Sequence, residues 1–341
     1  MLPIVSNPDG METICGYSFR PHDIDAAARQ PGISAFMRIR NGEEFVESTI
    51  RSHVDCLDEI VAVYHDTSDA TPAILMRLAG EYGPKLRVIH YLDTVAPLAS
   101  REHVRLPADA PGSFINVSNF AFAATTRRHF MLLDDDHLAW DDAFATLCAG
   151  VRRGEMQDDR MWCISAFNLM RGPGSQLGVP STDPFAGNGD HGLRAVRPGD
   201  FFEKDNRFER FVRNGRRREF KGFAYWHMKY LKRDAFANHD RERDPANRYN
   251  RKRRSFEEQA RPLSFAEVWR QERANLPRQA ISALFDDGHR LRLRRTLLAR
   301  DFVGEDVRAV FQRTVAGRWS GLCDRANPRD ALSEVETDAQ S

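Results

Sequence analysis

The chain has 341 residues, of which 41% are hydrophobic and 29% are charged, and 50 Lys+Arg against 49 Asp+Glu leave a formal net charge of +1. This composition excludes a disordered or membrane-embedded chain, and the length corresponds to one large domain or two average ones. Five cysteines with no pair at CxxC spacing argue against a disulfide framework or a zinc cluster, so we expect a cytoplasmic protein with reduced thiols.

Short apolar segments alternate with helical patterns in the first third of the chain. Residues 1–31 contain four prolines and few apolar runs, so we expect an irregular N-terminal arm there. Strands are then expected at 33–39, 59–64 and 86–91, with helices at 43–54 and 67–82 between them. Strands and helices joined by short connections predict an α/β, Rossmann-like fold with a mostly parallel sheet and helices on both faces.

The alternation continues after a surface loop that is expected at 94–114. A helix is expected at 118–128, a fourth strand at 130–133, a helix at 141–153 and a fifth strand at 162–169. Beyond residue 241 the pattern is mostly helical, up to a polar and acidic tail at 331–341 that we expect to be disordered.

A basic block covers residues 204–254, where 18 Lys+Arg stand against 7 Asp+Glu. Such a block favours an anionic partner, such as a phosphate-bearing ligand, a lipid surface or nucleic acid. A solvated face that pairs with the acidic remainder of the chain explains it equally well.

Three adjacent aspartates, Asp134, Asp135 and Asp136, directly follow the fourth expected strand. Their carboxylates repel one another, so a cation is expected at the carboxyl edge of the sheet, where α/β folds bind ligands. The first and third side chains leave the strand end on the same side. Asp134 and Asp136 can therefore address one Mg²⁺ or Mn²⁺, and turn-capping, solvated aspartates are the alternative reading.

The order of four segments resembles the nucleotide-sugar glycosyltransferases of the GT-A fold, close to the family 2 type. The matching residues are 37–44, 58–71, Asn119 and 132–137, within the stretch 33–140. The resemblance implies a GT-A fold and a metal-dependent transfer of a sugar from a nucleotide-sugar donor to a glycan or lipid-linked acceptor, in cell-surface polysaccharide synthesis.

The resemblance also implies the residues of the site. The donor nucleotide would contact Met37, Arg38, Arg40, Asn41, His65, Asp66, Asn119, Asp134, Asp135 and Lys229. The metal would be held by Asp134, Asp136 and a later histidine, for which His227 is the candidate, although a hydrogen-bonded core histidine is the other reading. The base that deprotonates the acceptor hydroxyl would be Asp190, in a glycine-rich loop, or Glu209. A retaining mechanism needs no such base.

These expectations divide the chain into four parts. They are the arm at 1–31, a GT-A catalytic domain at 32–240, a helical extension at 241–330 and the tail at 331–341. The catalytic domain has a nucleotide-binding half at 32–140 and an acceptor half at 141–240.

Two other functions remain open. A nucleotidyltransferase on a related α/β sheet predicts a glycine-rich, basic loop after the first strand, where residues 41–44 are acidic instead. A non-catalytic anion-binding module leaves the aspartates unexplained. Nucleic acid is not expected, because no RNA-binding signature is present. Arginines at 251–254 and 290–295 lie beside apolar positions and are explained either by a helical cap on the catalytic domain or by a peripheral contact with the inner face of the membrane.

Overall fold

One mixed sheet runs through the protein in the computed structural model, which describes residues 2–6, 11–98, 100–187, 191–205, 208–236, 248–315, 319 and 322. The strands of its first half are β1 (Val5–Ser6), β2 (Glu12–Ile14), β3 (Gln30–Ile39), β4 (Glu59–Tyr64), β5 (Leu86–Tyr91) and β6 (Arg127–Leu132). Those of its second half are β7 (His137–Ala139), β8 (Arg160–Arg171), β9 (Leu177–Pro180), β10 (Phe185–Ala186), β11 (Gly192–Ala195), β14 (Arg217–Tyr230) and β15 (Pro262–Leu263). The main path of the sheet is β1-β2-β5-β4-β3-β6-β11-β8-β14-β7, and β12 (Phe202–Asp205) pairs separately with β13 (Phe208–Phe211).

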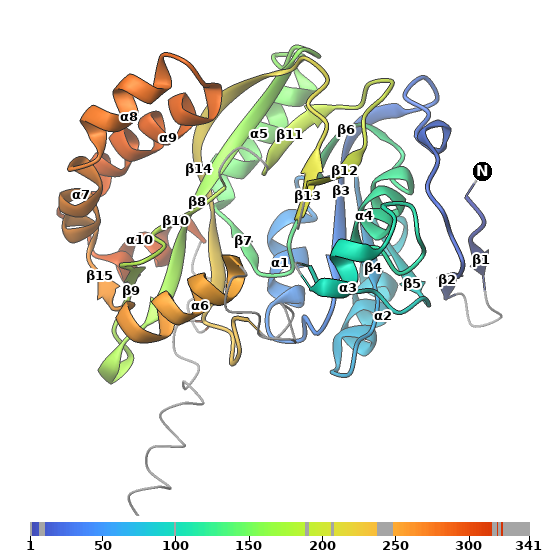
Figure 1. The fold of residues 1–341 in the computed structure, drawn as a ribbon, viewed down its shortest axis with the longest axis horizontal. Coiled ribbons are helices and arrows are strands. Elements are labelled where there is room, and N and C mark those ends of the chain that lie inside the picture. The colour runs from blue at the N-terminus through green and yellow to red at the C-terminus, as the bar shows by residue number, and fades with distance from the viewer. Residues whose placement is uncertain are drawn as a thin grey trace, which may run out of the picture.

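The first half of the sheet is parallel from β2 to β6. This confirms the predicted α/β class, and the carboxyl ends of β3, β4, β5 and β6 lie along one edge (Figure 1). The second half is mixed, because β11 runs antiparallel to both β6 and β8 while β14 runs parallel to β8. The arm expected to be irregular contains β1, β2, a 3-10 turn and the first residues of β3, and β2 pairs with the edge of β5.

Helices cover both faces of the sheet, as predicted. The helices α1 (Val46–His53), α2 (Thr71–Tyr82) and α5 (Asp141–Arg152) share a core with Ala35 and Met37 of β3. The neighbouring Phe36 points to the other face and packs with α4 (Phe114–Ala123). Successive side chains of a strand alternate between faces, so a continuous apolar run is needed where both faces are covered.

Two expectations for the middle of the chain need correction. The helix expected at 118–128 is α4 at 114–123, because β6 already begins at Arg127. The loop expected at 94–114 contains the short helix α3 (Arg101–Arg105), which Ser100 caps by accepting from the backbone of His103 at 3.1 Å. Short 3-10 turns lie at Pro21–Asp23, Gly83–Lys85, Pro173–Ser175 and Ala299–Phe302.

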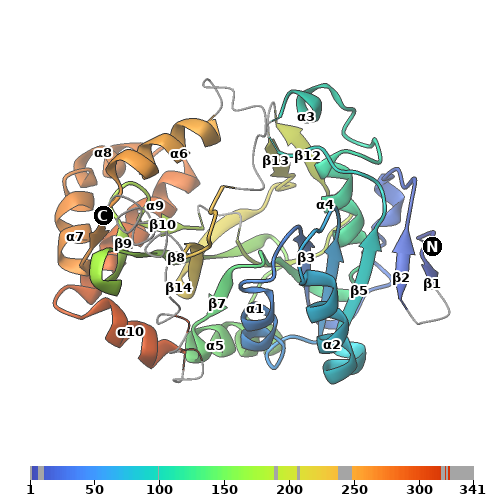
Figure 2. The same ribbon diagram turned by 90° about the horizontal axis from the view of Figure 1, so that it is seen from below.

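The helical extension packs against the second half of the sheet (Figure 2). It comprises α6 (Arg248–Gln259), α7 (Phe265–Arg273), α8 (Leu276–Ala283), α9 (Asp287–Leu298) and α10 (Val307–Thr314). Trp226 of β14 is fully buried in this interface, together with Phe311 of α10, and its indole N–H donates to Thr314 at 2.8 Å. None of the helices in the described ranges is long and apolar enough to cross a membrane.

Candidate functional site

A cavity of about 390 Å³ lies at the carboxyl edge of the sheet. Its wall contains residues from the ends of four strands: Arg38 and Arg40 of β3, His65 after β4, the aspartates 134–136 after β6, and Lys229 and Lys232 at the end of β14. Pockets of about 300–1,000 Å³ hold small-molecule ligands and cofactors. The sheet therefore gathers carboxylates, imidazoles and cations around a space of ligand size.

A buried lysine balances two of the three aspartates. Asp135 and Asp136 have side chains only 15% and 7% exposed, and Lys232 Nζ lies 3.1 Å from Asp135 Oδ1 and 2.9 Å from Asp136 Oδ2. Burial raises the pKa of Asp135 to about 6 in spite of Lys232. Burial also acts on Asp136, but Lys232 and His227 outweigh it and hold the pKa of that carboxyl well below its usual range. Asp134 differs, because its side chain is 36% exposed.

A chain of hydrogen bonds fixes the tautomer of His227. The amide nitrogen of Asn168 donates to the backbone oxygen of Asp183 at 2.7 Å, so the amide oxygen of Asn168 faces His227 Nδ1, 2.6 Å away. An oxygen at that position requires a proton on Nδ1. Nε2, the other ring nitrogen, faces Asp136 Oδ1 at 3.2 Å, and in the neutral form of this tautomer it carries a lone pair. Two acceptors that face each other at this distance need a proton or a cation between them.

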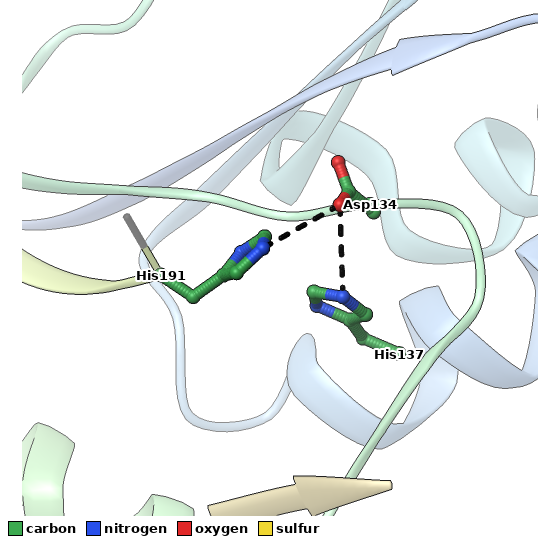
Figure 3. A group of neighbouring side chains, drawn as sticks. All are labelled: Asp134, His137 and His191. Atoms are coloured by element: carbon green, nitrogen blue, oxygen red, sulfur yellow. Dashed lines mark ion pairs between the residues drawn. The ribbon is translucent and has the colours of Figure 1, made fainter. Parts of the chain in front are cut away.

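His137 and His191 surround the third aspartate. His137 Nε2 and His191 Nε2 each lie 3.7 Å from the same oxygen, Asp134 Oδ2 (Figure 3). Burial lowers the pKa of His137 well below its usual range, with His191 and His227 adding to the effect, so this imidazole is neutral. The ligand atoms of Asp134, His137 and His191 all lie within 4.8 Å of one another, and so do those of Asp136, His137 and His227.

Arg38 and Glu209 form a buried pair in the wall of the cavity. Their side chains are 6% and 16% exposed and joined by a short salt bridge. Ser118 donates to the same carboxylate at 2.5 Å, and Arg38 also lies 3.6 Å from Asp134. Glu209 and Asp134 raise the pKa of Arg38 in spite of its burial. Glu209 is thus engaged in holding Arg38 toward the cavity.

The cavity includes most of the site residues that the sequence predicted, namely Arg38, Arg40, His65, Asp134, Asp135, Asp136, Glu209, His227 and Lys229. Lys229 is buried, which lowers the pKa of its ammonium to about 8, and the nearby Lys252 adds to this effect. Asp190 lies outside the described residues, although Gly187 and His191, which flank its loop, line the cavity.

Four residues that were predicted to contact the donor nucleotide do not line the cavity. Met37 is fully buried in the core beneath the sheet, because its neighbour Arg38 points to the cavity and side chains alternate along β3. Asn41 has a left-handed backbone with φ of 52° and accepts from the Ser68 backbone at 2.8 Å, as a turn residue does. Asp66 accepts from the backbone of Val95 at 2.7 Å. Asn119 bonds both the N–H and the C=O of Phe202 and so ties α4 to β12.

The sequence prediction missed His137 and His191 as candidate ligands. Both stand next to residues that were singled out, Asp136 and Asp190, and this adjacency was the available signal. What brings them together is the pairing of β11 and β14 with β8, which no local pattern predicts.

Comparisons with known proteins give a partial likeness of fold. No protein-family model matches the chain, and no curated protein matches it. Among solved structures, TarS of S. aureus (residues 1–349) is 12% identical over 58% of this chain and 60% of its own, with a TM-score of 0.34. Glucosyl-3-phosphoglycerate synthase from Mycobacterium tuberculosis, solved with Mn²⁺, uridine diphosphate and glucosyl-3-phosphoglycerate, is 17% identical over 46% of this chain and 50% of its own, with a TM-score of 0.27.

A mannosyltransferase from Pyrobaculum calidifontis, solved with GDP-Man and Mn²⁺, is 20% identical over 43% of this chain and 38% of its own, with a TM-score of 0.27. It belongs to the class of enzyme that the sequence resembles. The chain spans less than two thirds of the length of each of these three proteins. At such TM-scores the likeness carries no argument about activity, and the functional argument rests on the site itself.

Proposed function

We propose that this protein is a metal-dependent glycosyltransferase that moves a sugar from a nucleotide-sugar donor to a glycan or lipid-linked acceptor. The observation that carries the proposal is the cavity at the carboxyl edge of the sheet, where acidic, imidazole and cationic side chains converge. A nucleoside diphosphate needs just these groups: a divalent cation for its oxygens, held by the acids, and fixed positive charge around them.

The oxygen and nitrogen ligand atoms of this site fit a divalent cation, Mn²⁺ or Mg²⁺. We assign the ion to Asp136 and His227, with Asp134 as the third ligand of the predicted set. Asp136 Oδ1 is buried and has no hydrogen bond among the described residues, while the Nε2 lone pair of His227 faces it. A bound ion at this place supplies charge neutralisation for the departing diphosphate. Imidazole ligands favour Mn²⁺ over Mg²⁺, which prefers oxygen.

Basic side chains in the cavity wall hold the nucleotide-sugar donor. Arg38, Arg40 and Lys229 line the cavity, and the engaged Glu209 keeps Arg38 in place for a phosphate or ribose oxygen. Arginine is suited to such contacts because its planar fork matches two phosphate oxygens at once. Lys229, with a pKa of about 8, is protonated below that pH and carries the positive charge that a diphosphate requires.

The acceptor hydroxyl needs a base, and we assign this role to Asp190 rather than Glu209. The carboxylate of Glu209 already accepts from Arg38 and Ser118, so its oxygens are engaged within the protein. Replacing Asp190 by Asn should lower the rate by about 10²–10⁴-fold, the usual contribution of a general base. A normal rate in Asp190→Asn moves the base to another residue or favours a retaining mechanism, which the anomeric configuration of the product decides by NMR.

A screen of nucleotide sugars with Mn²⁺, read as release of nucleoside diphosphate, tests the activity. Turnover should vanish in EDTA and in Asp136→Asn, because both remove the proposed ion. Asp158→Asn is the matched control: this aspartate is 56% exposed on the surface, so its loss should leave the rate unchanged. Donor binding that is equally tight with and without EDTA would rule out the metal role.

A surface on the helical extension supports peripheral contact with an anionic membrane, in keeping with a cytoplasmic enzyme of cell-surface polysaccharide synthesis. Ile281, Leu284 and Phe285, at the end of α8, are 64%, 75% and 83% exposed. Beside them lies a second cavity of about 1020 Å³, whose wall contains four carboxylates and six arginines: Arg160, Arg213, Arg217, Arg218, Arg290 and Arg294. Two of these arginines, Arg213 and Arg218, pair with Asp287. Apolar side chains beside cations suit an anionic bilayer, at about 1 kcal/mol per cation.

This surface adjoins the start of β14, whereas the donor cavity lies at the end of that strand. Docking there leaves the donor cavity open to solution, which favours a glycan acceptor over a lipid-linked one. Co-sedimentation with phosphatidylglycerol-containing vesicles at low and high salt tests the contact, with Phe285→Ser as the variant. Absence of binding at low salt would leave the extension as a helical cap.

A further inference from the structure

A second group of metal-ligand side chains lies beside the Asp136–His227 pair. We propose that Asp134, His137 and His191 form a binding site for a divalent transition-metal ion, separate from the ion of the proposed reaction. The three residues come from distant parts of the sheet: Asp134 follows β6, His137 begins β7 and His191 precedes β11. A carboxylate and two imidazoles are the ligand set of many open transition-metal sites.

The spacing of the ligand atoms suits an ion. Both imidazole Nε2 atoms are 3.7 Å from Asp134 Oδ2, which is too long for hydrogen bonds between them (Figure 3). Ligands on a tetrahedral ion with bonds of about 2.1 Å lie about 3.4 Å apart. The two nitrogen–oxygen distances of 3.7 Å therefore need to shorten by only a few tenths of an ångström, and the ligand atoms of all three residues lie within 4.8 Å of one another.

An orphaned nitrogen is the independent sign of a ligand. His137 is 2% exposed, and its Nε2 is a buried atom without a hydrogen-bond partner among the described residues. A buried polar atom left in this state destabilises the fold unless a ligand satisfies it. This nitrogen lies 3.7 Å from Asp134 Oδ2, where a metal ion between the two atoms would satisfy it.

The two groups differ in how their charge is balanced. Lys232 lies within 2.9 Å of Asp136, so that carboxylate already has a cation beside it. Asp134 has Arg38 at 3.6 Å, and Arg38 is itself held by Glu209. Asp134 is also partly exposed on the cavity wall, so an ion bound there keeps open positions for a further ligand from the cavity.

Imidazole donors determine which ion this site takes. Nitrogen ligands favour Co²⁺, Zn²⁺ or Mn²⁺, whereas Mg²⁺ prefers oxygen and keeps its waters. We therefore expect Co²⁺ to bind at Asp134, His137 and His191 and to resist displacement by a tenfold excess of Mg²⁺.

Cobalt binding to the metal-free full chain tests the inference without any substrate. Bound Co²⁺ is counted by mass spectrometry after equilibrium dialysis, and its visible absorption reports imidazole ligands. We expect two equivalents in the wild type, one in His191→Ala and one in the matched variant His227→Ala. His191→Gln, which keeps a polar side chain but has no imidazole, repeats the loss of one equivalent if His191→Ala folds poorly, as judged by circular dichroism.

The outcomes separate this site from the proposed function. No bound Co²⁺ in the wild type, two equivalents kept in both His191→Ala and His191→Gln, or a single equivalent that is lost in His227→Ala overturns the inference. A single equivalent that His191→Ala loses and His227→Ala keeps supports this site and instead removes the Asp136–His227 pair as a metal site. Loss of this site alone leaves the glycosyltransferase proposal standing.

Discussion

Replacing Lys232 tests the charge balance of the site. Its ammonium lies 2.9 Å from Asp136 and 3.1 and 3.2 Å from the two oxygens of Asp135, and its side chain is 15% exposed. We predict that Lys232→Met lowers the free energy of unfolding by about 3 kcal/mol in EDTA. Removing one partner of a buried ion pair costs about 3–5 kcal/mol, because the other charge stays buried.

A Coulomb estimate agrees with that range. At an effective dielectric constant of about 20, opposite charges 2.9 Å apart attract by about 6 kcal/mol. Several kcal/mol are regained because the ammonium no longer has to be buried. Water in the cavity also solvates part of the exposed carboxylates, so the lower end of the range applies.

The stability that Lys232→Met loses should depend on pH. Burial already raises the pKa of Asp135 to about 6, and the loss of Lys232 raises it further. A carboxyl with a raised pKa in the folded state is destabilising once it ionises. The gap in stability between the variant and the wild type should therefore widen as pH rises through 6 and narrow at pH 5.

Urea unfolding in EDTA and in Mn²⁺ is the assay. Bound Mn²⁺ stabilises either form by about 2.7 kcal/mol at 100 times that form's dissociation constant. Mn²⁺ should therefore narrow the gap, because the variant lacks the ammonium that competes with the ion for Asp136 and binds the ion more tightly. Lys221→Met is the control: Lys221 forms a surface pair with Glu219, and such pairs contribute about 1 kcal/mol or less. Equal stability of Lys232→Met and the wild type in EDTA would refute the reasoning.

Three further predictions concern other charged groups. Arg216→Met should lower the free energy of unfolding in urea by about 3–5 kcal/mol, because the Arg216 side chain and its carboxylate partner are fully buried. Arg128→Met, which removes an exposed ion pair, should lower it by about 1 kcal/mol or less. Donor affinity should fall about tenfold as pH rises through 8, where Lys229 loses its proton, and titration calorimetry should show a flat profile in Lys229→Gln. Glu209→Gln should raise the KM for the donor more than it lowers kcat, because it frees Arg38 without removing a reacting group; a loss confined to kcat would instead make Glu209 the base.

The sequence predicted the parallel half of the sheet closely because its signals are local. The strand β4 at 59–64 and β5 at 86–91 have the expected bounds, since short apolar runs between turns leave few other structures. By contrast β14 at 217–230 was not predicted. Its first residues are charged and only partly buried, and its apolar residues become part of a 14-residue strand because they pair along β8.

The residues of the candidate site likewise fall into those that local sequence patterns identify and those that only the tertiary structure places. Asp134 and Asp136 were visible in the sequence because an acidic triplet after a buried strand is a local pattern, whereas Met37 and Asn119 were assigned to the donor from a resemblance and lie in the core instead. Only side-chain direction within the sheet separates Arg38 in the cavity from Met37 beneath it.

The sequence by itself determined the order of strands and helices, the α/β class and the acidic edge, since each depends on residues close together in the chain. Tertiary structure alone decided which cations and imidazoles face those acids. Lys232 reaches Asp136 from almost a hundred residues away, and His137 and His191 meet at Asp134 because β11 pairs with both β6 and β8. Such encounters depend on strand pairing over long separations, for which the chain carries no local signal.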